Sequence, residues 1–208
     1  MDHAQITILA TIAASYFAAA LVPGPSSITV MRSSLAGGQS CGLAAAAGVA
    51  LGNSIYAAVA AFGLALVIKE AGAAFLAIKL AGGAYLIYLG LRMAFNRGRA
   101  AVFADKPATA RLGRFFRRAL LTDLSNPKTI MAFLGIFAIA FPAHPTHELS
   151  LAVTGTVGLI SLSWHSLLAH LFARPILRQA YHRLGRWIDR IAGGLISLFG
   201  VAVAATSL

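Results

Sequence analysis

The chain alternates between long apolar runs and short polar connections. The runs lie near residues 5–35, 41–68, 72–95, 116–141, 149–173 and 187–206. A helix crosses a bilayer with about 20 consecutive apolar residues, and each run reaches that length. The pattern therefore predicts an all-α membrane protein with six transmembrane helices in one transmembrane domain, residues 1–208. Asp2 and His3 stand where a cleaved signal sequence has basic residues, so we expect the first run to be retained.

Composition agrees with this architecture and narrows the classes of function. The chain is 59% hydrophobic and 11% charged, with a mean hydropathy of +0.79, whereas soluble domains carry about a quarter charged residues. Its one cysteine excludes a disulfide framework. We find no nucleotide-binding loop, no nucleophile–base pair and no metal-ligand spacing in the sequence. We therefore expect a protein that is not an enzyme and that uses no cofactor and no metal.

The net charge of +11 is explained by membrane topology. Of the 17 Lys and Arg residues, eight lie between Arg92 and Arg118 and five between Arg174 and Arg190. These two clusters follow the third and fifth runs, so they lie on the same side of the membrane. Under the positive-inside rule that side is the cytoplasm, which places both termini outside. Anionic membrane lipid is a natural partner for the basic clusters, and nothing calls for nucleic acid.

Two halves of the chain resemble each other. "KLAGGAYLIYLG" at 79–90 matches "RIAGGLISLFG" at 190–200, and "PSSITVM" from Pro25 is similar to "PKTIMAF" from Pro127. Each half holds three runs, and an odd number makes the copies cross the membrane in opposite directions. The pattern favours a 3+3 inverted repeat, as in many secondary transporters. Close packing of small residues is the alternative explanation for the matching glycines.

Two runs are interrupted by proline, at corresponding places in the two halves. The first interruption is Pro23-Gly24-Pro25-Ser26-Ser27, and the second is Asp123-Leu124-Ser125-Asn126-Pro127-Lys128. Each predicts a helix restart, with Gly24 or Asn126 as N-cap and a proline as the first helical residue. A restart leaves backbone N–H groups free at a positive dipole end, which suits a carboxylate. Hydroxyl groups of Ser26, Ser27 and Thr129 would add donors. The alternative is a packed kink without a ligand.

Two ionisable side chains accompany the second interruption. Counted from the basic flank, Lys128 lies about 15 Å deep at 1.5 Å per residue, and a charge at that depth predicts a functional site. A cation for a carboxylate and an anion, Asp123, for an ammonium would suit a zwitterion. Asp123 is also our candidate for proton coupling, although an interfacial pair with Arg117 or Arg118 is an alternative. Both interruptions are expected in the cytoplasmic half of the membrane, about 8–15 Å from its surface.

Four further polar residues in the runs are weaker candidates for substrate contacts. Asn53 and Tyr56 share a face of the second helix at i, i+3 spacing, and Trp164 and His165 lie inside the fifth. Polar residues in a membrane bundle also serve as hydrogen-bonding links between helices. Both readings remain open for these residues.

Three motifs together resemble the LysE/RhtB family of bacterial amino-acid exporters. They are "PGPSSITVMRSSLAGG", "KLAGGAYLIYLG" and "LSNPKTIMAFL", in the same order and at the same places in a chain of this length. The resemblance implies a secondary transporter of the bacterial cytoplasmic membrane that exports amino acids, is driven by the proton gradient, and is compatible with a homodimer. The family's marked positions correspond here to Pro23, Gly24, Pro25, Asn126, Pro127 and Lys128. "SLSWHSLLAHLF" in the fifth run matches no pattern of the family.

We therefore expect an exporter of amino acids. Few acidic residues lie in the runs, which favours neutral or small substrates over cationic ones. The alternative function is a membrane protein that transports nothing, such as an assembly factor or a receptor-like helical bundle. Resistance of expressing cells to toxic amino acids distinguishes the two.

Overall fold

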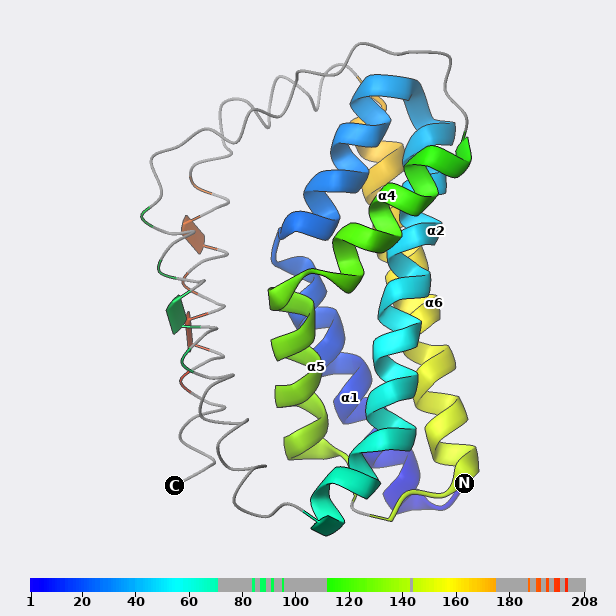
Figure 1. Cartoon of the computed structure of the whole chain (residues 1–208), viewed down its shortest axis with the longest axis vertical. Helices are drawn as coiled ribbons and strands as arrows, with labels where there is room; N and C mark the ends of the chain where they lie inside the picture. Colours follow the sequence, from blue (N-terminus) through cyan, green and yellow to red (C-terminus); the bar gives the residue numbers. More distant parts are fainter. Residues whose placement is uncertain are drawn as a thin grey trace.

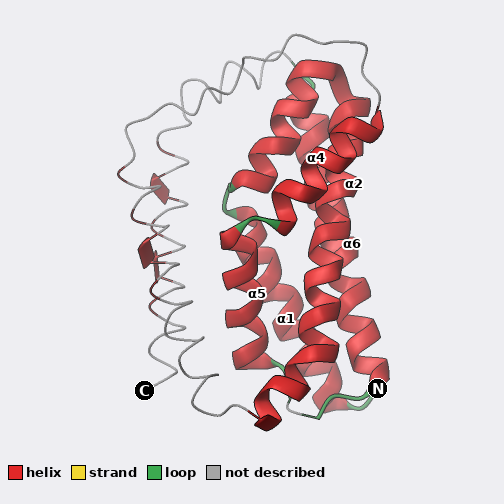
Figure 2. Cartoon of the chain, viewed as in Figure 1, coloured by secondary structure: helices red, strands yellow, loops and turns green. Residues whose placement is uncertain are grey.

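The computed structural model describes residues 1–70, 112–142 and 144–174, with isolated positions between 84 and 95 and between 187 and 201. Every regular element in these ranges is an α-helix (Figure 2). Three helices are long and apolar enough to cross a membrane: His3–Leu21, Pro25–Phe62 and His147–Phe172. The predicted all-α membrane architecture is confirmed. The predicted spans 72–95 and 187–206 lie outside the described residues except for isolated positions, so the count of six stays a prediction.

The first predicted span is broken where its prolines lie. Helix α1 (His3–Leu21) ends before Pro23, and helix α2 (Pro25–Glu70) begins at Pro25. Val22 is extended, with φ −75° and ψ 116°, which is the conformation that a following proline favours. Pro23 also has no N–H to continue the helix. The predicted restart at Pro25 is confirmed.

The fourth predicted span is broken in the same way. Two residues separate the end of helix α4 (Leu112–Leu124) from the start of helix α5 (Pro127–Ala140). Asn126 is the N-cap of α5 and Pro127 is its first residue. Proline is well suited to that position, because its fixed φ is helical and its missing N–H would have no intrahelical partner. The second predicted restart is therefore also confirmed.

Helix α2 turns back on itself at Gly38, which has φ 77° and ψ −175°. Only glycine adopts such a backbone without strain. The turn separates a short arm, residues 25–37, from a long arm, residues 39–70, and the chain reverses direction there (Figure 1). The short arm completes the predicted first span, and the long arm is the predicted second span.

The broken helices run in opposite directions. In Figure 1, α1 and the short arm of α2 ascend, whereas α4 and α5 descend beside them. The long arm of α2 descends, and helix α6 (His147–Phe172) ascends against it. An inverted repeat of three spans requires these opposite directions for spans one and four and for spans two and five. The repeat itself stays a prediction.

Both breaks lie near the middle of the helical bundle. Helices α4 and α5 are 13 and 14 residues long, about 20 Å each at 1.5 Å per residue. The second break is therefore near the middle of the bundle. The first break is beside it, because Asn126 Nδ2 donates to Ser26 Oγ at 2.9 Å. Helix α4 begins at Leu112, a turn earlier than the predicted span, and the expected position of the breaks in the cytoplasmic half of the membrane stays a prediction.

Two apolar clusters lie on opposite sides of the breaks. The aromatic cluster joins α1, α5, α6 and the long arm of α2, and its members include Ile12, Tyr16, Phe133, Phe137, Phe141 and Leu149. The alanine-rich cluster joins the short arm of α2, the start of its long arm, α4 and the end of α6, and its members include Val30, Ala45, Ala46, Val49, Ala119 and Ala169. Each end of the bundle is thus closed by its own packed layer.

Substituting Gly48 with alanine is expected to destabilise the bundle. A Cβ there would lie 2.3 Å from the backbone oxygen of Phe116 and 3.0 Å from the nitrogen of Leu120, so α2 and α4 would have to separate. Overpacking of this kind costs roughly 1–3 kcal/mol. The melting temperature of the purified protein in detergent should therefore fall. Gly155→Ala in α6 is the matched control, since nothing lies within 4 Å of its Cβ position. Equal melting temperatures for the two variants would contradict the close approach.

Candidate functional site

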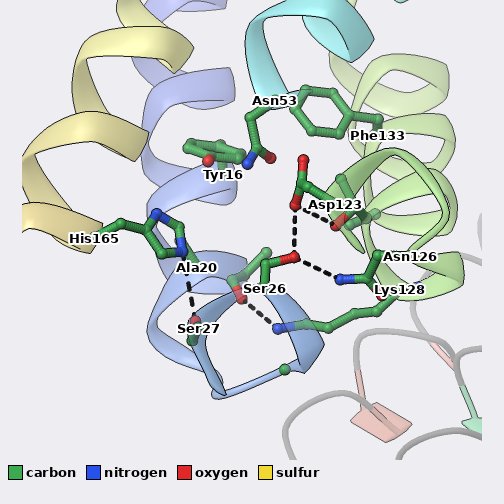
Figure 3. Close-up of a pocket in the computed structure, with 14 residues that line it drawn as sticks. Tyr16, Ala20, Ser26, Ser27, Asn53, Asp123, Asn126, Lys128, Phe133 and His165 are labelled. Carbon is green, nitrogen blue, oxygen red and sulfur yellow. Dashed lines mark hydrogen bonds between the residues drawn. The ribbon is translucent and has the colours of Figure 1, made fainter. Parts of the chain in front are cut away.

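Side chains from both breaks converge on one small buried cavity (Figure 3). It has a volume of about 40 Å³, and its polar lining consists of Ser26, Ser27, Asn53, Asp123, Asn126, Lys128, Thr129 and His165. One water needs roughly 10–15 Å³ of such volume, whereas pockets for small molecules measure about 300–1,000 Å³. At this volume the cavity has room for water and not for a metabolite.

Ser26 connects the two breaks. Its hydroxyl donates to Asp123 Oδ1 at 2.6 Å and accepts from Asn126 Nδ2 at 2.9 Å. All three side chains are buried. The predicted proximity of the segment 23–27 to the segment 126–128 is therefore confirmed, and the first segment faces the interior of the bundle.

Lys128 stabilises the end of α1. Its Nζ donates to the backbone oxygens of Ala19, at 3.2 Å, and Val22. In an unbroken helix the Ala19 oxygen would accept from residue 23, but Pro23 has no N–H. Gly24 leaves space for the lysine, since a Cβ there would lie 2.9 Å from Lys128 Cδ. The ammonium thus occupies the negative end of the α1 dipole.

The second break is satisfied by side chains as well. Asn126 Oδ1 accepts from the backbone N–H of Lys128 at 3.1 Å and so caps α5. That N–H would otherwise pair with the Leu124 oxygen, which instead accepts from the hydroxyl of Tyr56. Tyr56 also stacks on Phe133, with 5.8 Å between ring centroids. It therefore supports the break from α2 and does not line the cavity.

Asp123 is fully buried and has one carboxylate oxygen without a partner. Oδ1 accepts from Ser26 and, at 3.3 Å, from Thr129, whereas Oδ2 has no hydrogen bond. Gly52 faces it closely, since a Cβ there would lie 2.5 Å from Oδ2. The interfacial pair with Arg117 or Arg118 is wrong, because α4 carries the carboxylate inward to the break. A buried polar atom without a partner is costly, which points to a ligand at this oxygen.

The opposite wall of the cavity is built around His165. Its Nδ1 donates to the backbone oxygen of Ser161 at 2.9 Å, because a carbonyl can only accept. Its Nε2 lies 3.5 Å from Ser27 Oγ. Asn53 Nδ2 donates to Val49 O at 3.0 Å and to Ser161 Oγ at 3.3 Å. This wall links α6 to both arms of α2, and it presents polar groups to the cavity across from Asp123 (Figure 3).

Comparison with known proteins identifies the family of this chain. The sequence profile described as "LysE type translocator" matches residues 17–207. This chain belongs to that family. A threonine efflux protein of Salmonella typhi is 31% identical over 200 residues, which cover 95% of this chain and 97% of the relative. The uncharacterized membrane protein YahN of Escherichia coli strain K12 is 35% identical over 181 residues, 86% of this chain and 81% of the relative. No solved structure matches the chain.

Membership in the LysE type translocator family confirms the resemblance found in the sequence. Translocators move their substrates across a membrane and are not enzymes, as the sequence predicts. The alternative of a bundle that transports nothing loses its support. The chain is therefore a membrane transporter, and the cavity between its broken helices is its candidate substrate site.

Most predicted site residues of this translocator meet at the cavity. The cavity is lined by eight of them: Gly24, Ser26, Ser27, Asn53, Asp123, Asn126, Lys128 and His165. Trp164 does not line it, because it packs against the alanine-rich cluster and meets Phe17 edge-on at 6.1 Å. Pro23 and Pro25 shape the first break, and Pro127 begins α5. Neither Pro23 nor Pro25 lines the cavity.

Sequence reasoning missed four residues that build the site. Tyr16 and Phe133 form one end of the cavity, next to the aromatic cluster. Nothing in the sequence marked these two residues as part of a site, because aromatic residues are common in membrane helices. Gly52 has no side chain and so leaves room for Asp123. The backbone oxygen of Ser161 accepts a hydrogen bond from His165. Ser161 precedes His165 by one helical turn, a spacing from which their contact could have been predicted.

Proposed function

We propose that this translocator exports neutral amino acids across the bacterial cytoplasmic membrane and is driven by the proton gradient. One observation carries the proposal: a carboxylate oxygen of Asp123 lies buried without a partner in a cavity where two helix restarts meet. Groups of both signs flank that cavity. An amino acid, with an ammonium and a carboxylate on one carbon, matches such a site.

The two ends of a zwitterion have different partners in this proposal. Asp123 Oδ2 accepts from the ammonium of the substrate. The carboxylate of the substrate binds the free N–H groups in the first turn of α2, because Gly24 has no side chain to cap them. It also binds the ammonium of Lys128. The cavity must widen for this, since about 40 Å³ holds only water.

The charges of the site favour a neutral side chain. Asp123 is the one acidic residue among the described residues that line the cavity, and the ammonium on the α-carbon uses it. A cationic side chain would need a second anion. The polar wall of Ser27, Asn53 and His165 suits a small polar side chain. Threonine, for which the relative from Salmonella typhi is named, is a candidate substrate.

Proton coupling follows from competition at Asp123. A carboxylate buried in the membrane needs either a proton or the substrate ammonium to offset its charge. If it exchanges one for the other on opposite sides, each amino acid exported is matched by a proton imported. The exchange couples export to the gradient without any cofactor.

The direction of transport rests on the orientation of the bundle. One end of the bundle, where α4 begins and α6 ends, is rich in arginine (Figure 1). Its arginines are Arg32, Arg114, Arg117, Arg118 and Arg174. The positive-inside rule assigns this end to the cytoplasm, and with it α1 and α5 to the outer half. Both termini are then outside, as six spans require. A homodimer remains compatible with this orientation.

Everted membrane vesicles that contain the protein test the proposal. They expose the cytoplasmic side, so export appears as uptake. With an acidic lumen, we expect uptake of threonine or another neutral amino acid from a labelled panel, and little uptake of lysine or arginine. A protonophore should abolish the uptake, and vesicles without the protein are the control. Absence of uptake for the whole panel, or preference for lysine and arginine, would contradict the proposal.

A further inference from the structure

The ammonium of Lys128 lies at the end of α1 and not beside Asp123 (Figure 3). It donates to the backbone oxygens of Ala19 and Val22, and no described residue forms a salt bridge with it. Both oxygens lost their intrahelical donors to the break. The lysine therefore makes a bond between two helices, α5 and α1, that ordinary packing does not explain.

This bond lies directly beside both helix breaks. α1 ends at the first break, and Lys128 is in the first turn of α5, directly after the second break. Beyond it, α1 and α5 pack through Tyr16 and Phe133, whose ring centroids are 5.6 Å apart. Those rings belong to the aromatic cluster, which closes the end of the bundle opposite the arginines.

We propose that Lys128 is a latch: the carboxylate of the substrate draws its ammonium away from the end of α1, which releases α1 from α5 and opens the cavity to the outer side. The inference rests on the proposed function and adds how binding leads to release. Lys128 is a positioning residue for this opening as well as a contact for the substrate.

The energetics favour the exchange of partners. The end of a helix presents about half a negative charge, whereas a carboxylate presents a full one, so the carboxylate attracts the ammonium more strongly. A ligand shifts an equilibrium only by its different affinity for the two states. The carboxylate supplies that difference, because it gains the ammonium only in the released state. Water that enters from the outer side then satisfies the two backbone oxygens of α1.

A cysteine at position 132 can report the opening. Ala132 lies one turn beyond Lys128 on α5, lines the cavity and is 8% exposed. The single native cysteine, Cys41, is buried and can be replaced, so the reporter is Cys41→Ala with Ala132→Cys. Right-side-out vesicles, washed free of amino acids, receive a membrane-impermeant thiol reagent from outside. We expect slow labelling without substrate and a roughly tenfold faster rate with threonine loaded inside, a shift of about 1.4 kcal/mol.

Removing the ammonium tests the latch without any substrate. In the reporter background, Lys128→Met should label fast whether or not threonine is present. Arg117→Met loses the same charge at an exposed site on α4 and should behave as the reporter does. Slow labelling of the Lys128→Met protein would overturn the latch. Failure of the vesicles to release any amino acid of the panel would instead overturn the proposed function, together with the part of the latch that depends on substrate.

Gly24→Ala provides a variant that keeps the lysine. Its Cβ would lie 2.9 Å from Lys128 Cδ and 3.3 Å from Nζ, so the side chain must shift away from the end of α1. Gly24 does not have a positive φ, and alanine therefore fits its backbone. We expect labelling without substrate at a rate between those of the reporter and Lys128→Met. A rate equal to that of the reporter would count against the latch even if Lys128→Met failed to fold.

Discussion

Asp123→Asn is expected to abolish the uptake of amino acids by everted vesicles that a proton gradient drives. The asparagine oxygen can accept from Ser26 and Thr129 as Oδ1 does, so the break should keep its shape. The amide that replaces Oδ2 does not ionise and so cannot take up and release a proton, and the substrate ammonium has no anion to meet. Uptake against a concentration gradient should fall to that of vesicles without the protein.

Exchange measurements separate the coupling role from a general loss of function. Vesicles loaded with unlabelled threonine should still exchange it for labelled threonine, more slowly than with the unsubstituted protein, because exchange needs no net proton movement. Glu148→Gln, at an exposed site in the first turn of α6, removes a carboxylate elsewhere and should change neither activity. If Asp123→Asn vesicles still concentrate threonine when the lumen is acidified, Asp123 does not carry the proton.

The helix breaks were the part of the fold most open to sequence reasoning. Proline removes a donor and restricts the residue before it, effects that do not depend on tertiary context. The ends of α1 and α4 and the starts at Pro25 and Pro127 follow from these effects alone. The start of α4 did not follow from them, because Leu112 to Arg118 looks like a basic connection in the sequence although it forms helix.

The chemistry of the site was predicted in kind and not in detail. Asp123, Lys128 and the two serines are polar residues within apolar runs, and such residues are found where a bundle has a functional interior. The sequence suggested that Lys128 awaits a carboxylate, whereas it already has partners in the backbone of α1. Partners of this kind are invisible to sequence reasoning, because any residue type supplies a backbone oxygen.

Close approaches and supporting contacts were harder to predict. Gly52 stands opposite Asp123 and Tyr56 donates to Leu124, and both contacts join residues about 70 positions apart in the chain. Without an alignment, nothing in the local pattern distinguishes Gly52 from a glycine such as Gly155, which faces open space. Tyr56 was predicted to contact substrate, whereas its hydroxyl donates to the Leu124 oxygen, which the break leaves without an intrahelical donor.

Asn126→Asp is expected to lower transport strongly while leaving the helices in place. Asn126 has two functions: Oδ1 caps the N–H of Lys128, and Nδ2 donates to Ser26. Aspartate is an equally good N-cap, so α5 should begin at the same residue. It cannot donate, however, and loss of a buried donor costs about 1–3 kcal/mol. If that cost falls on the transport cycle, uptake of threonine should drop roughly tenfold to hundredfold.

Two controls assign the effect to the bond between the breaks. Thr146→Asp replaces the N-cap of α6 at an exposed site and should leave uptake unchanged, which shows that an aspartate cap is harmless in itself. Asn126→Ser retains a capping hydroxyl without adding charge, and it is too short to replace the donor to Ser26. If the bond to Ser26 holds the two breaks in register, both Asn126 variants lose uptake, and Asn126→Asp loses more because its carboxylate repels that of Asp123. Full uptake by Asn126→Ser would mean that the two breaks keep their register without this bond.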